Sequence, residues 1–330
     1  MSRIAASMAT LHSQLSSLET GCEMFYSAIR KFEICNLDHV SGIYVAGDVI
    51  NGELWLHTAK DFSNCACYVN LVGKVQTWFA AGGETFRSEN LVATQRHTFL
   101  KNGPIKRGLY VMKFSLQIPT NCPSSLLGYS MCKIGYFLEA TIEKYPFPES
   151  IKVPVTIRGA VDLNRVKSAI GRTCLGKQDS APIRAFCFTT LAPSLIVELN
   201  FPKLGFVPGE ECEIPVLVHN RTRVPVTELR TELVEYASIS GSGVSEDKHA
   251  EQLTVSVNIV AEFMRVKVPP GKSEEVFMTL RIPPHISPQI THKLMQTCHI
   301  LKVYTNQSAD SICSTEVTIG SIPMRERTKL

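Results

Sequence analysis

The sequence predicts an all-β protein built from two tandem β-sandwich domains. Short runs of β-branched and other apolar residues, separated by Gly, Pro, Asn and Ser, follow one another along most of the chain, which is typical of strands and turns. Few stretches after residue 20 show the periodicity of a long helix. A motif pattern from the first half returns 162 to 164 residues later, which indicates two domains of the same architecture.

Composition sets the size and class of the molecule. The 330 residues are enough for about two domains at roughly 150 residues each. Hydrophobic residues make up 44% and charged residues 19% of the chain, which excludes a disordered tail or a highly charged coiled coil. The net charge of +4 and the pI of about 8.4 are too weak to indicate nucleic-acid binding.

Residues 1–22 are expected to be an N-terminal extension with a short helix. Apolar residues recur there at helical spacing: Ile4, Met8, Leu11, Leu15 and Leu18. We expect this helix to dock on the first domain, because its polar face lacks the Lys and Arg of the alternative, a membrane-surface or partner helix. No membrane span or secretory signal is visible, so we expect a cytoplasmic protein.

The eleven Cys residues are expected to be reduced thiols, mostly small residues of the domain cores. The chain has no Cys-x-x-Cys pair, and its His residues are not spaced with Cys as zinc ligands. We therefore expect no metal and no cofactor. An extracellular tandem-sandwich binder is an alternative, which requires export and paired cysteines.

The first domain is expected to span residues 23–164. Asn51-Gly52 lies between two apolar runs and predicts a hairpin turn, because both residues tolerate positive φ. The expected strands are Phe32–Ile34, Asp48–Leu56 with this turn inside it, Cys67–Val75, Tyr110–Ile118, Lys133–Ile142 and Val153–Ile157.

The second domain is expected to span residues 186–322, with a short tail at 323–330. A basic linker at 165–185 precedes it, because that segment has little apolar periodicity and an excess of positive charge. The expected strands are Ser194–Leu199, Cys212–Val218, Thr227–Tyr236, Thr254–Val260, Glu275–Ile282, Ile300–Tyr304 and Thr315–Ile319.

Two short motifs approach enzyme signatures, but each lacks an essential residue. Gly171–Lys177 has the glycine and lysine positions of a phosphate-binding loop, but Gln178 stands where Mg²⁺ needs a Ser or Thr hydroxyl. Gly128–Cys132 lacks the second glycine of a nucleophile elbow. We expect a basic linker and a solvated loop, with a nucleotide-binding enzyme built on Gly171–Lys177 as the alternative.

The spacing of the histidines does not predict a metal site, and the glycosylation sequons do not by themselves predict a modified residue. His285, His292 and His299 are each seven residues apart, but prolines between them argue against the helix that would align them as metal ligands. Asn220 and Asn306 begin glycosylation sequons, which have meaning only in a secreted chain.

A series of motifs across both halves carries a family resemblance. The first half contributes Tyr44-x-x-Gly47-Asp48-x-Ile50-x-Gly52-x-Leu54, Val69-x-Leu71-x-Gly73, Phe114-x-Leu116-x-Ile118-Pro119, Ile134-x-Tyr136-x-Leu138 and Val161-Asp162-Leu163-Asn164. The second half contributes Gly205–Glu210, His219–Thr222, Pro269–Gly271 and Leu280–Pro284. In the order and spacing of these motifs over residues 28–320, the sequence resembles the arrestin-domain superfamily, and most of all its α-arrestin (arrestin-domain-containing) branch.

The resemblance implies two Ig-like sandwiches, arrestin N-like and C-like, joined by a short hinge. It implies a non-catalytic cytosolic adaptor without a cofactor, associated with the plasma membrane or endosomes. Such adaptors bind the cytoplasmic tails of membrane receptors or transporters and route them to endocytosis and ubiquitin-linked sorting. A structural subunit of a trafficking complex, such as a retromer-like one, is the alternative.

The same resemblance suggests partner-binding residues. In arrestins, basic residues on the first strand help to hold phosphorylated tails, and Arg30-Lys31 occupy a similar place before Phe32. Lys106-Arg107, before the run that starts at Tyr110, are a second candidate pair. Their charge suits acidic or phosphorylated peptides through charge-assisted hydrogen bonds.

The chain departs from the α-arrestin pattern at its C-terminal end. It has no Pro-Pro-x-Tyr motif, through which many α-arrestins recruit ubiquitin ligases. The last three residues, Thr328, Lys329 and Leu330, fit a PDZ-type ligand and approach a peroxisomal address.

Overall fold

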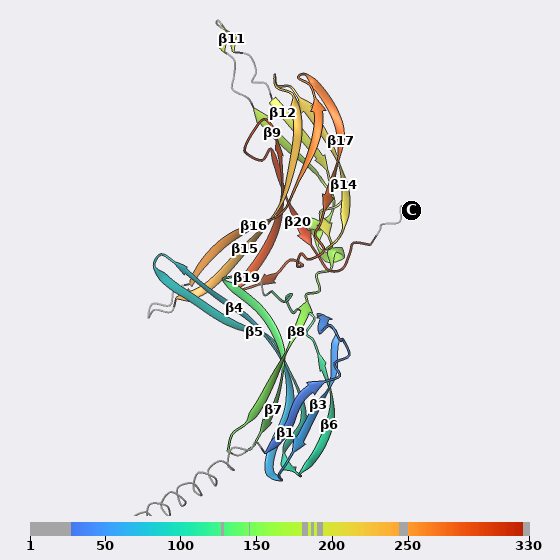
Figure 1. Ribbon diagram of the computed structural model, residues 1–330. Helices are drawn as coiled ribbons and strands as arrows, with labels where there is room; N and C mark the ends of the chain where they lie inside the picture. The colour runs from blue at the N-terminus through green and yellow to red at the C-terminus, as the bar shows by residue number, and fades with distance from the viewer. Residues whose placement is uncertain are drawn as a thin grey trace, which may run out of the picture.

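The protein is a pair of β-sandwiches placed end to end, as the computed structural model shows (Figure 1). The structure describes residues 28–126, 129–144, 146–179, 184–185, 188–189, 194–243 and 250–325. In these ranges the chain forms twenty strands and two one-turn 3-10 helices. The predicted fold class, an all-β protein of two tandem Ig-like sandwiches, is confirmed.

The N-terminal sandwich contains eight strands. They are β1 (Ile29–Cys35), β2 (Ile43–Val45), β3 (Val49–Thr58), β4 (Phe62–Ala81), β5 (Glu84–Ile105), β6 (Gly108–Gln117), β7 (Cys132–Glu143) and β8 (Glu149–Arg158). One sheet has the order β1-β3-β6, and the facing sheet has the order β5-β4-β7-β8-β2. Alternate residues of β3, β4 and β7 are buried, which is the pattern of sheets with one solvated face. Leu54, Leu71 and Leu138 meet in the core between the two sheets.

The C-terminal sandwich has the same two-layer plan. Its elements are β9 (Thr173–Asp179), β12 (Ser194–Asn200), β13 (Gly205–Phe206), β14 (Glu211–Asn220), β15 (Val226–Gly243), β16 (Ala250–Val268), β17 (Lys272–Arg281), β18 (Thr291–His292), β19 (Met295–Thr305) and β20 (Cys313–Ile319). One sheet has the order β17-β14-β12-β9; in the other, β13-β20-β19-β15 is extended by β16. Two further short strands, β10 (Arg184–Ala185) and β11 (Phe188–Thr189), pair with each other.

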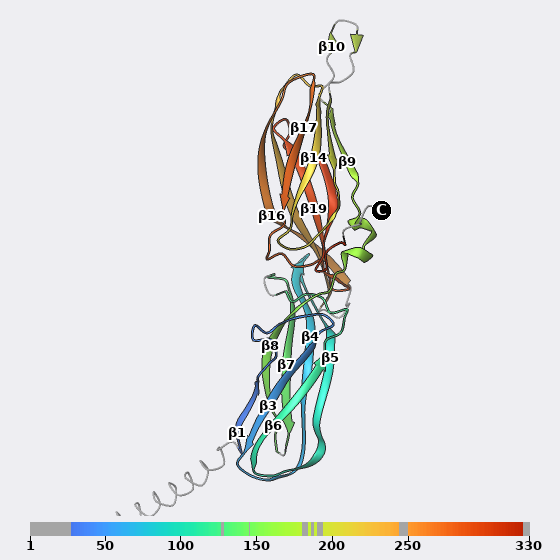
Figure 2. The same cartoon turned by 90° about the vertical axis from the view of Figure 1, so that its right-hand side faces the viewer.

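A shared sheet joins the two sandwiches at the waist of the molecule. The last two residues of β15 pair with Phe86 and Arg87 of β5, so that strands of both domains form one eleven-stranded sheet. Figure 2 shows the two sandwiches end to end from a second side. Ile239 and Met295 of the C-terminal sandwich also pack into the N-terminal core. The relative placement of the sandwiches therefore depends on main-chain pairing as well as on side-chain packing.

The connection between the domains is a short segment tied to the end of the chain. It contains the 3-10 turns η2 (Leu163–Arg165) and η3 (Lys167–Ala169). The Val161 N–H donates to Ser321 Oγ at 2.8 Å, and Asn164 Nδ2 donates to the Pro323 carbonyl at 2.9 Å. These bonds fix the connection against residues that follow the last strand.

The internal repeat predicted from the sequence corresponds to a turn that occurs once in each sandwich, at Gly47-Asp48 and at Gly209-Glu210. Gly47 and Gly209 have φ values of 98° and 84°, a conformation that favours glycine. The acidic side chains that follow them, Asp48 and Glu210, each accept a hydrogen bond from the backbone N–H three residues earlier, at 2.8 Å and 2.9 Å. The two halves of the sequence therefore repeat because each sandwich needs the same turn.

These turns connect equivalent strands in the two domains. The short strand before each turn pairs in parallel with the last long strand of its own sandwich, β2 with β8 and β13 with β20. The Asp48 carbonyl accepts the Ile118 N–H at 2.8 Å, and the Glu210 carbonyl accepts the Ile282 N–H at 2.9 Å. Both pairs of repeated motifs thus belong to one structural unit that occurs twice.

The hairpin turn predicted at Asn51-Gly52 is wrong. Both residues lie inside β3 and pair with Ser115 and Phe114 of β6. A Cβ atom at Gly52 would lie 2.7 Å from the Phe114 ring, so the glycine gives the ring its space. The local sequence resembled a turn because close packing and turns both select glycine.

Two strands of seven or more residues, β5 and β9, were not predicted from the sequence. β5 has mostly polar, exposed residues and lacks an apolar alternation. Thr173–Asp179, placed in the basic linker of residues 165–185, instead form β9, which pairs with β12 over seven residues. The linker prediction is therefore wrong for Thr173–Asp179. These residues form a strand because they pair with β12, although they lack the apolar periodicity by which a strand is predicted from sequence. The predicted helix in residues 1–22 lies outside the described residues.

The cysteines among the described residues are free thiols. Burial raises the pKa of Cys67 to about 12, and raises the pKa values of Cys132 and Cys313 to about 11. These thiols are protonated core residues at neutral pH. Over the described part of the chain, no helix is long and apolar enough to cross a membrane.

Replacing Gly52 by Ala tests the packing explanation. The added methyl group must displace the buried Phe114 ring or Leu37, whose nearest atoms would lie at 2.7 Å and 2.8 Å. We expect Gly52→Ala to lower the free energy of unfolding by about 1–3 kcal/mol in chemical denaturation. Gly135→Ala is the control, because its new Cβ meets nothing closer than 3.4 Å. Equal stabilities for the two variants would contradict the explanation.

Candidate partner-binding site

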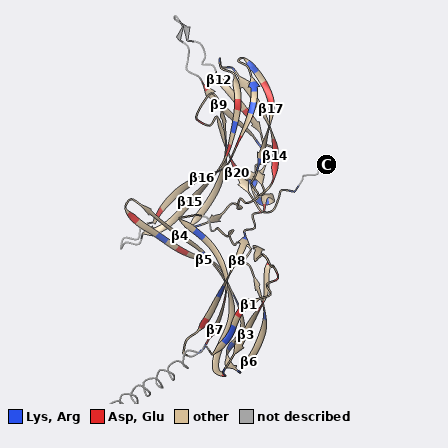
Figure 3. Ribbon diagram, in the orientation of Figure 1, with Lys and Arg blue, Asp and Glu red and all other residues tan. Residues whose placement is uncertain are grey.

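The two predicted basic pairs lie at the same end of the N-terminal sandwich. Ile29 of β1 pairs with Thr58 of β3, and Thr58 pairs with Gly108 of β6. Because neighbouring strands lie about 4.8 Å apart, the start of β1 and the start of β6 are separated by about two strand spacings. We call this cluster the basic end; it consists of Arg30, Lys31, Lys60, Lys106 and Arg107. Figure 3 shows how the charged positions are distributed along the ribbon.

The two basic residues of β1 differ in how much of their charge is engaged. Lys31 Nζ lies 2.5 Å from Glu33 Oε1 and 4.2 Å from the centre of the Trp55 ring. The Lys31 hydrogen bond keeps the pKa of Glu33 below its usual value. Arg30 is exposed and forms no ion pair with any residue in the described ranges. Arg30 is thus the freer cation for a partner.

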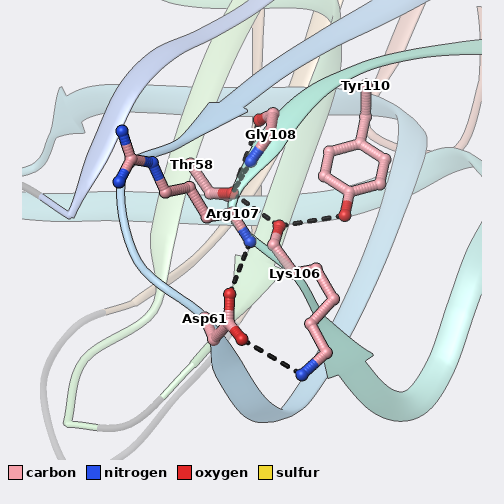
Figure 4. A network of polar contacts seen from close by, with 6 residues as sticks. All are labelled: Thr58, Asp61, Lys106, Arg107, Gly108 and Tyr110. Carbon is pink, nitrogen blue, oxygen red and sulfur yellow. Dashed lines mark hydrogen bonds and ion pairs between the residues drawn. The ribbon is translucent and has the colours of Figure 1, made fainter.

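A hydrogen-bond network fixes the turn between β5 and β6 (Figure 4). The buried Thr58 hydroxyl donates to the Lys106 carbonyl at 2.9 Å and accepts the Gly108 N–H at 3.2 Å. The Tyr110 hydroxyl donates to the same carbonyl at 2.9 Å. The basic pair at 106–107 is therefore presented by a fixed backbone.

Asp61 forms an ion pair with Lys106, whereas the Arg107 guanidinium has no ion pair within the described part of the chain. The Asp61 carboxylate lies 3.1 Å from Lys106 Nζ and accepts the Arg107 backbone N–H at 2.7 Å. The Arg107 N–H and then Lys106 lower the pKa of Asp61. The Arg107 guanidinium points away from this carboxylate (Figure 4). Sequence reasoning missed Asp61 and Lys60, because only the strand register places their loop beside the other basic residues.

The basic end borders an edge strand. Among the described strands, β1 pairs only with β3. The edge of a sheet carries backbone N–H and C=O groups that can bind an extended peptide as an added strand. Main-chain pairing and charge can therefore act together on one peptide.

A second candidate surface is a groove between the domains. It has a volume of about 620 Å³, and its walls come from the loop before β7, from β16 and from the segment after β17. Tyr129, Met131, Val255, Val257 and Ile286 are among the lining residues. The wall is mostly apolar, and one of its residues, Val257, is 48% exposed to solvent. The groove suits an apolar side chain of a partner.

A buried polar cluster ties the groove wall to the C-terminal domain. The Tyr129 hydroxyl donates to Glu235 Oε1, and His299 Nε2 lies 3.0 Å from Glu235 Oε2. This His299 contact is poorly aligned for a hydrogen bond, and Nδ1 has no partner among the described residues. Burial raises the pKa of Glu235, but the nearby His299 and the hydrogen bond from Tyr129 outweigh it, so the pKa lies below its usual value. Sequence reasoning singled out His299 but missed Glu235.

The three histidines of the sequence pattern do not come together. His292 Nε2 lies 3.1 Å from Asn90 Oδ1, His299 contacts Glu235, and His285 lines the groove. The described part of the chain contains no group of three residues placed to hold a metal ion. The seven-residue spacing therefore does not bring these three histidines together at one site.

The motifs that approached enzyme signatures lie in other settings. Gly171–Lys177 continues into the extended β9 rather than into a helix, so its backbone lacks the cradle of a phosphate-binding loop. Ser130 lines the groove, while Gly128 lies outside the described residues. Asn220 is fully buried and donates to the Val268 carbonyl at 3.0 Å, so this sequon asparagine is inaccessible in the folded protein. The PDZ-type residues Thr328, Lys329 and Leu330 also lie outside the described residues.

Comparison with known families defines the class. Two end-to-end sandwiches with a repeated turn and a short tied connection match a two-domain family. Residues 34–164 match the arrestin (or S-antigen) N-terminal domain, and residues 193–324 match the arrestin (or S-antigen) C-terminal domain. A comparison with curated proteins gave no match.

The chain belongs to the arrestin-domain superfamily. Arrestin domains indicate a receptor-binding adaptor or scaffold in general, and proteins of this superfamily are typically non-catalytic. The resemblance drawn from the sequence motifs is confirmed at the level of the superfamily.

Removing the Tyr129 hydroxyl tests the link between the groove wall and β15. We expect Tyr129→Phe to cost about 1–3 kcal/mol of unfolding free energy at pH 7, because a buried carboxylate loses a donor. The folded-state pKa of Glu235 is lowered, so its contribution is present above the ordinary value of 4.5 and is lost as pH falls below it. The difference between variant and wild type should shrink in that acidic window. A difference that stays constant down to low pH would contradict this assignment.

Proposed function

We propose that this protein is a non-catalytic adaptor of the α-arrestin type that binds cytoplasmic tails of membrane receptors or transporters. It acts in the cytoplasm, at the plasma membrane or endosomes, and links its cargo to endocytic and ubiquitin-dependent sorting. The observation that carries this proposal is the basic end. Two basic pairs that are 76 residues apart in the sequence lie at the same end of one sheet, beside an edge strand of an arrestin N-terminal domain.

The preferred ligand is an acidic or phosphorylated tail. Arg30 and Arg107 supply guanidinium groups that are not paired with the neighbouring carboxylates. Guanidinium groups bind phosphate oxygens through two parallel hydrogen bonds, which gives geometry as well as charge. A tail that pairs along β1 meets Arg30 on that strand, and its continuation across the end of the sheet meets Arg107 two strands away.

The interdomain groove supports the same function. It offers an apolar contact far from the basic end, so a longer cargo segment can be held at both. Two weak contacts on one rigid body bind more tightly than either contact alone. The output step is recruitment of ubiquitin-ligase machinery by a route other than Pro-Pro-x-Tyr, which this sequence lacks.

A peptide-binding experiment tests the basic end directly. The probe is a synthetic fluorescent peptide with three phosphoserines among glutamates, and anisotropy gives its Kd. We expect Arg30→Glu/Arg107→Glu to weaken binding at least about tenfold, because two charge-assisted contacts become repulsive. Binding of the wild type should also weaken steeply with added salt.

A matched control separates the site from net charge. Lys133→Glu/Arg158→Glu makes the same charge change on exposed residues of β7 and β8. This control should bind the peptide nearly as well as the wild type. Equal losses in both variants would contradict the proposed site.

Proximity labelling in living cells tests the wider role. We expect the wild type to label membrane receptors, endosomal proteins and ubiquitin ligases, and the double variant Arg30→Glu/Lys31→Glu to lose this set. Labelling of one stable soluble complex that is unchanged in the variant would overturn the adaptor proposal in favour of a structural subunit.

A further inference from the structure

The C-terminal sandwich has an open side where two edge strands face solvent. Among the described strands, β17 pairs only with β14, and β16 pairs only with β15. Each edge carries a large exposed aromatic residue: Phe277 on β17 is 60% exposed, and Phe263 on β16 is 65% exposed. Exposed phenylalanines on unpaired edges favour association, because they add apolar surface to free main-chain hydrogen-bonding groups.

A narrow slot between these edges reaches toward the core. Its volume is about 190 Å³, and Phe263 and Phe277 line it together with Met264 and the buried Met278. Arg281 spans the slot, with its guanidinium 3.8 Å from Glu262 of β16 and 3.1 Å from Glu211 of β14. The open side is therefore apolar at its centre and charged at one end.

The charges along β17 are complementary to those of a second copy of β17. Glu275, Phe277 and Arg281 share the outer face of the strand, since Met278 and Leu280 alternate with them and are buried. When two β17 strands pair antiparallel about Met278, Arg281 lies opposite Glu275 of the second copy. The same register places Phe277 opposite Thr279 of the second copy and diagonal to its Phe277.

We propose that this open side is a homodimer interface, in which two β17 strands pair antiparallel about a two-fold axis. The four-stranded sheet β17-β14-β12-β9 then continues into the second copy as an eight-stranded sheet. Both Phe277 side chains are covered, and two Arg281–Glu275 ion pairs close the ends. A two-fold interface of this kind is self-limiting, because each copy uses the same edge.

Other edges are less suited to pair with themselves. The C-terminal half of β16 presents Arg265 and Lys267 beside Phe263, so antiparallel self-pairing there brings like charges together. β1 carries Arg30 and Lys31 near one end, with only Glu33 to balance them. Opposite charges at the two ends of the exposed face distinguish β17 from β16 and β1.

The dimer adds valency to the proposed adaptor. The interface lies in the C-terminal sandwich, so the basic end of each copy, on the N-terminal sandwich, remains open. Two basic ends on one particle raise the apparent affinity for clustered or repeated cargo tails. The dimer itself does not rest on the proposed function, and its test needs no cargo.

Sedimentation equilibrium of the full chain tests the interface. The single-chain mass is 36.6 kDa. We expect the average mass to rise toward twice this value with increasing micromolar concentration, and Phe277→Glu to remain monomeric. Phe147→Glu, a change at a 74% exposed phenylalanine of the N-terminal sandwich, should dimerise like the wild type.

A charge swap tests the proposed register of the two β17 strands. Recovery in the double variant would also show that the single variants do not lose dimerisation through misfolding. Glu275→Arg and Arg281→Glu should each weaken dimerisation about tenfold, because each change acts twice across a two-fold axis. The double variant should regain dimerisation, although it does not restore the Arg281 contacts with Glu211 and Glu262 within one copy. A wild type that stays at 36.6 kDa throughout, or a double variant no better than the single ones, would overturn the proposal.

Discussion

The main-chain pairing of β15 with β5 is the constraint on which the arrangement of the molecule depends. Among the described residues two pairs form this junction, and they join the large sheets of the two sandwiches into one sheet. The Thr77 hydroxyl, which is fully buried, reinforces it by donating to the Ser240 carbonyl at 2.8 Å. Buried main-chain and hydroxyl groups lose their hydrogen-bond partners when the domains part, so separation is costly. The protein therefore presents its surfaces from one body rather than from two independent domains.

This constraint gives the proposed function its geometry. The groove exists because the loop with Tyr129 closes on β15 and β16 of the other domain. The basic end lies on the N-terminal sandwich away from that junction, where β1, β3 and β6 begin or end (Figure 1). A cargo segment that reaches both surfaces meets a fixed separation, which selects for length as well as for charge. The polar cluster at Glu235 adds an electrostatic contribution to the same junction.

The sequence predicted the fold class well, because most strands alternate apolar and polar residues and each domain repeats one glycine turn. It failed where the local pattern has another cause. The sequence around Gly52 predicted a turn, but this glycine lies in a strand and leaves space for the Phe114 ring. The sequence of β9 predicted a linker, because most of its side chains are polar. The polar β5 was missed for the same reason, since its order comes from pairing with β4. Pairing partners far apart in the chain are not visible in a local pattern.

The candidate site shows the same division. The residue types of the two basic pairs are visible in the sequence, but their proximity follows from strand register alone. The difference between Arg107, whose guanidinium points away from Asp61, and Lys106, which pairs with it, is a matter of side-chain direction. Glu235 could not be predicted as an interdomain residue, because its partner Tyr129 lies 106 residues away.

Hydrogen-exchange mass spectrometry with and without the triphosphorylated peptide tests the central claim most directly. The account predicts new protection at β1 and at the β5–β6 turn on peptide binding. It also predicts that the end of β15 exchanges as slowly as the strands inside each sandwich, with or without the peptide. Protection elsewhere on the molecule, or fast exchange at the end of β15, would contradict the view of one body with its cargo site at the basic end.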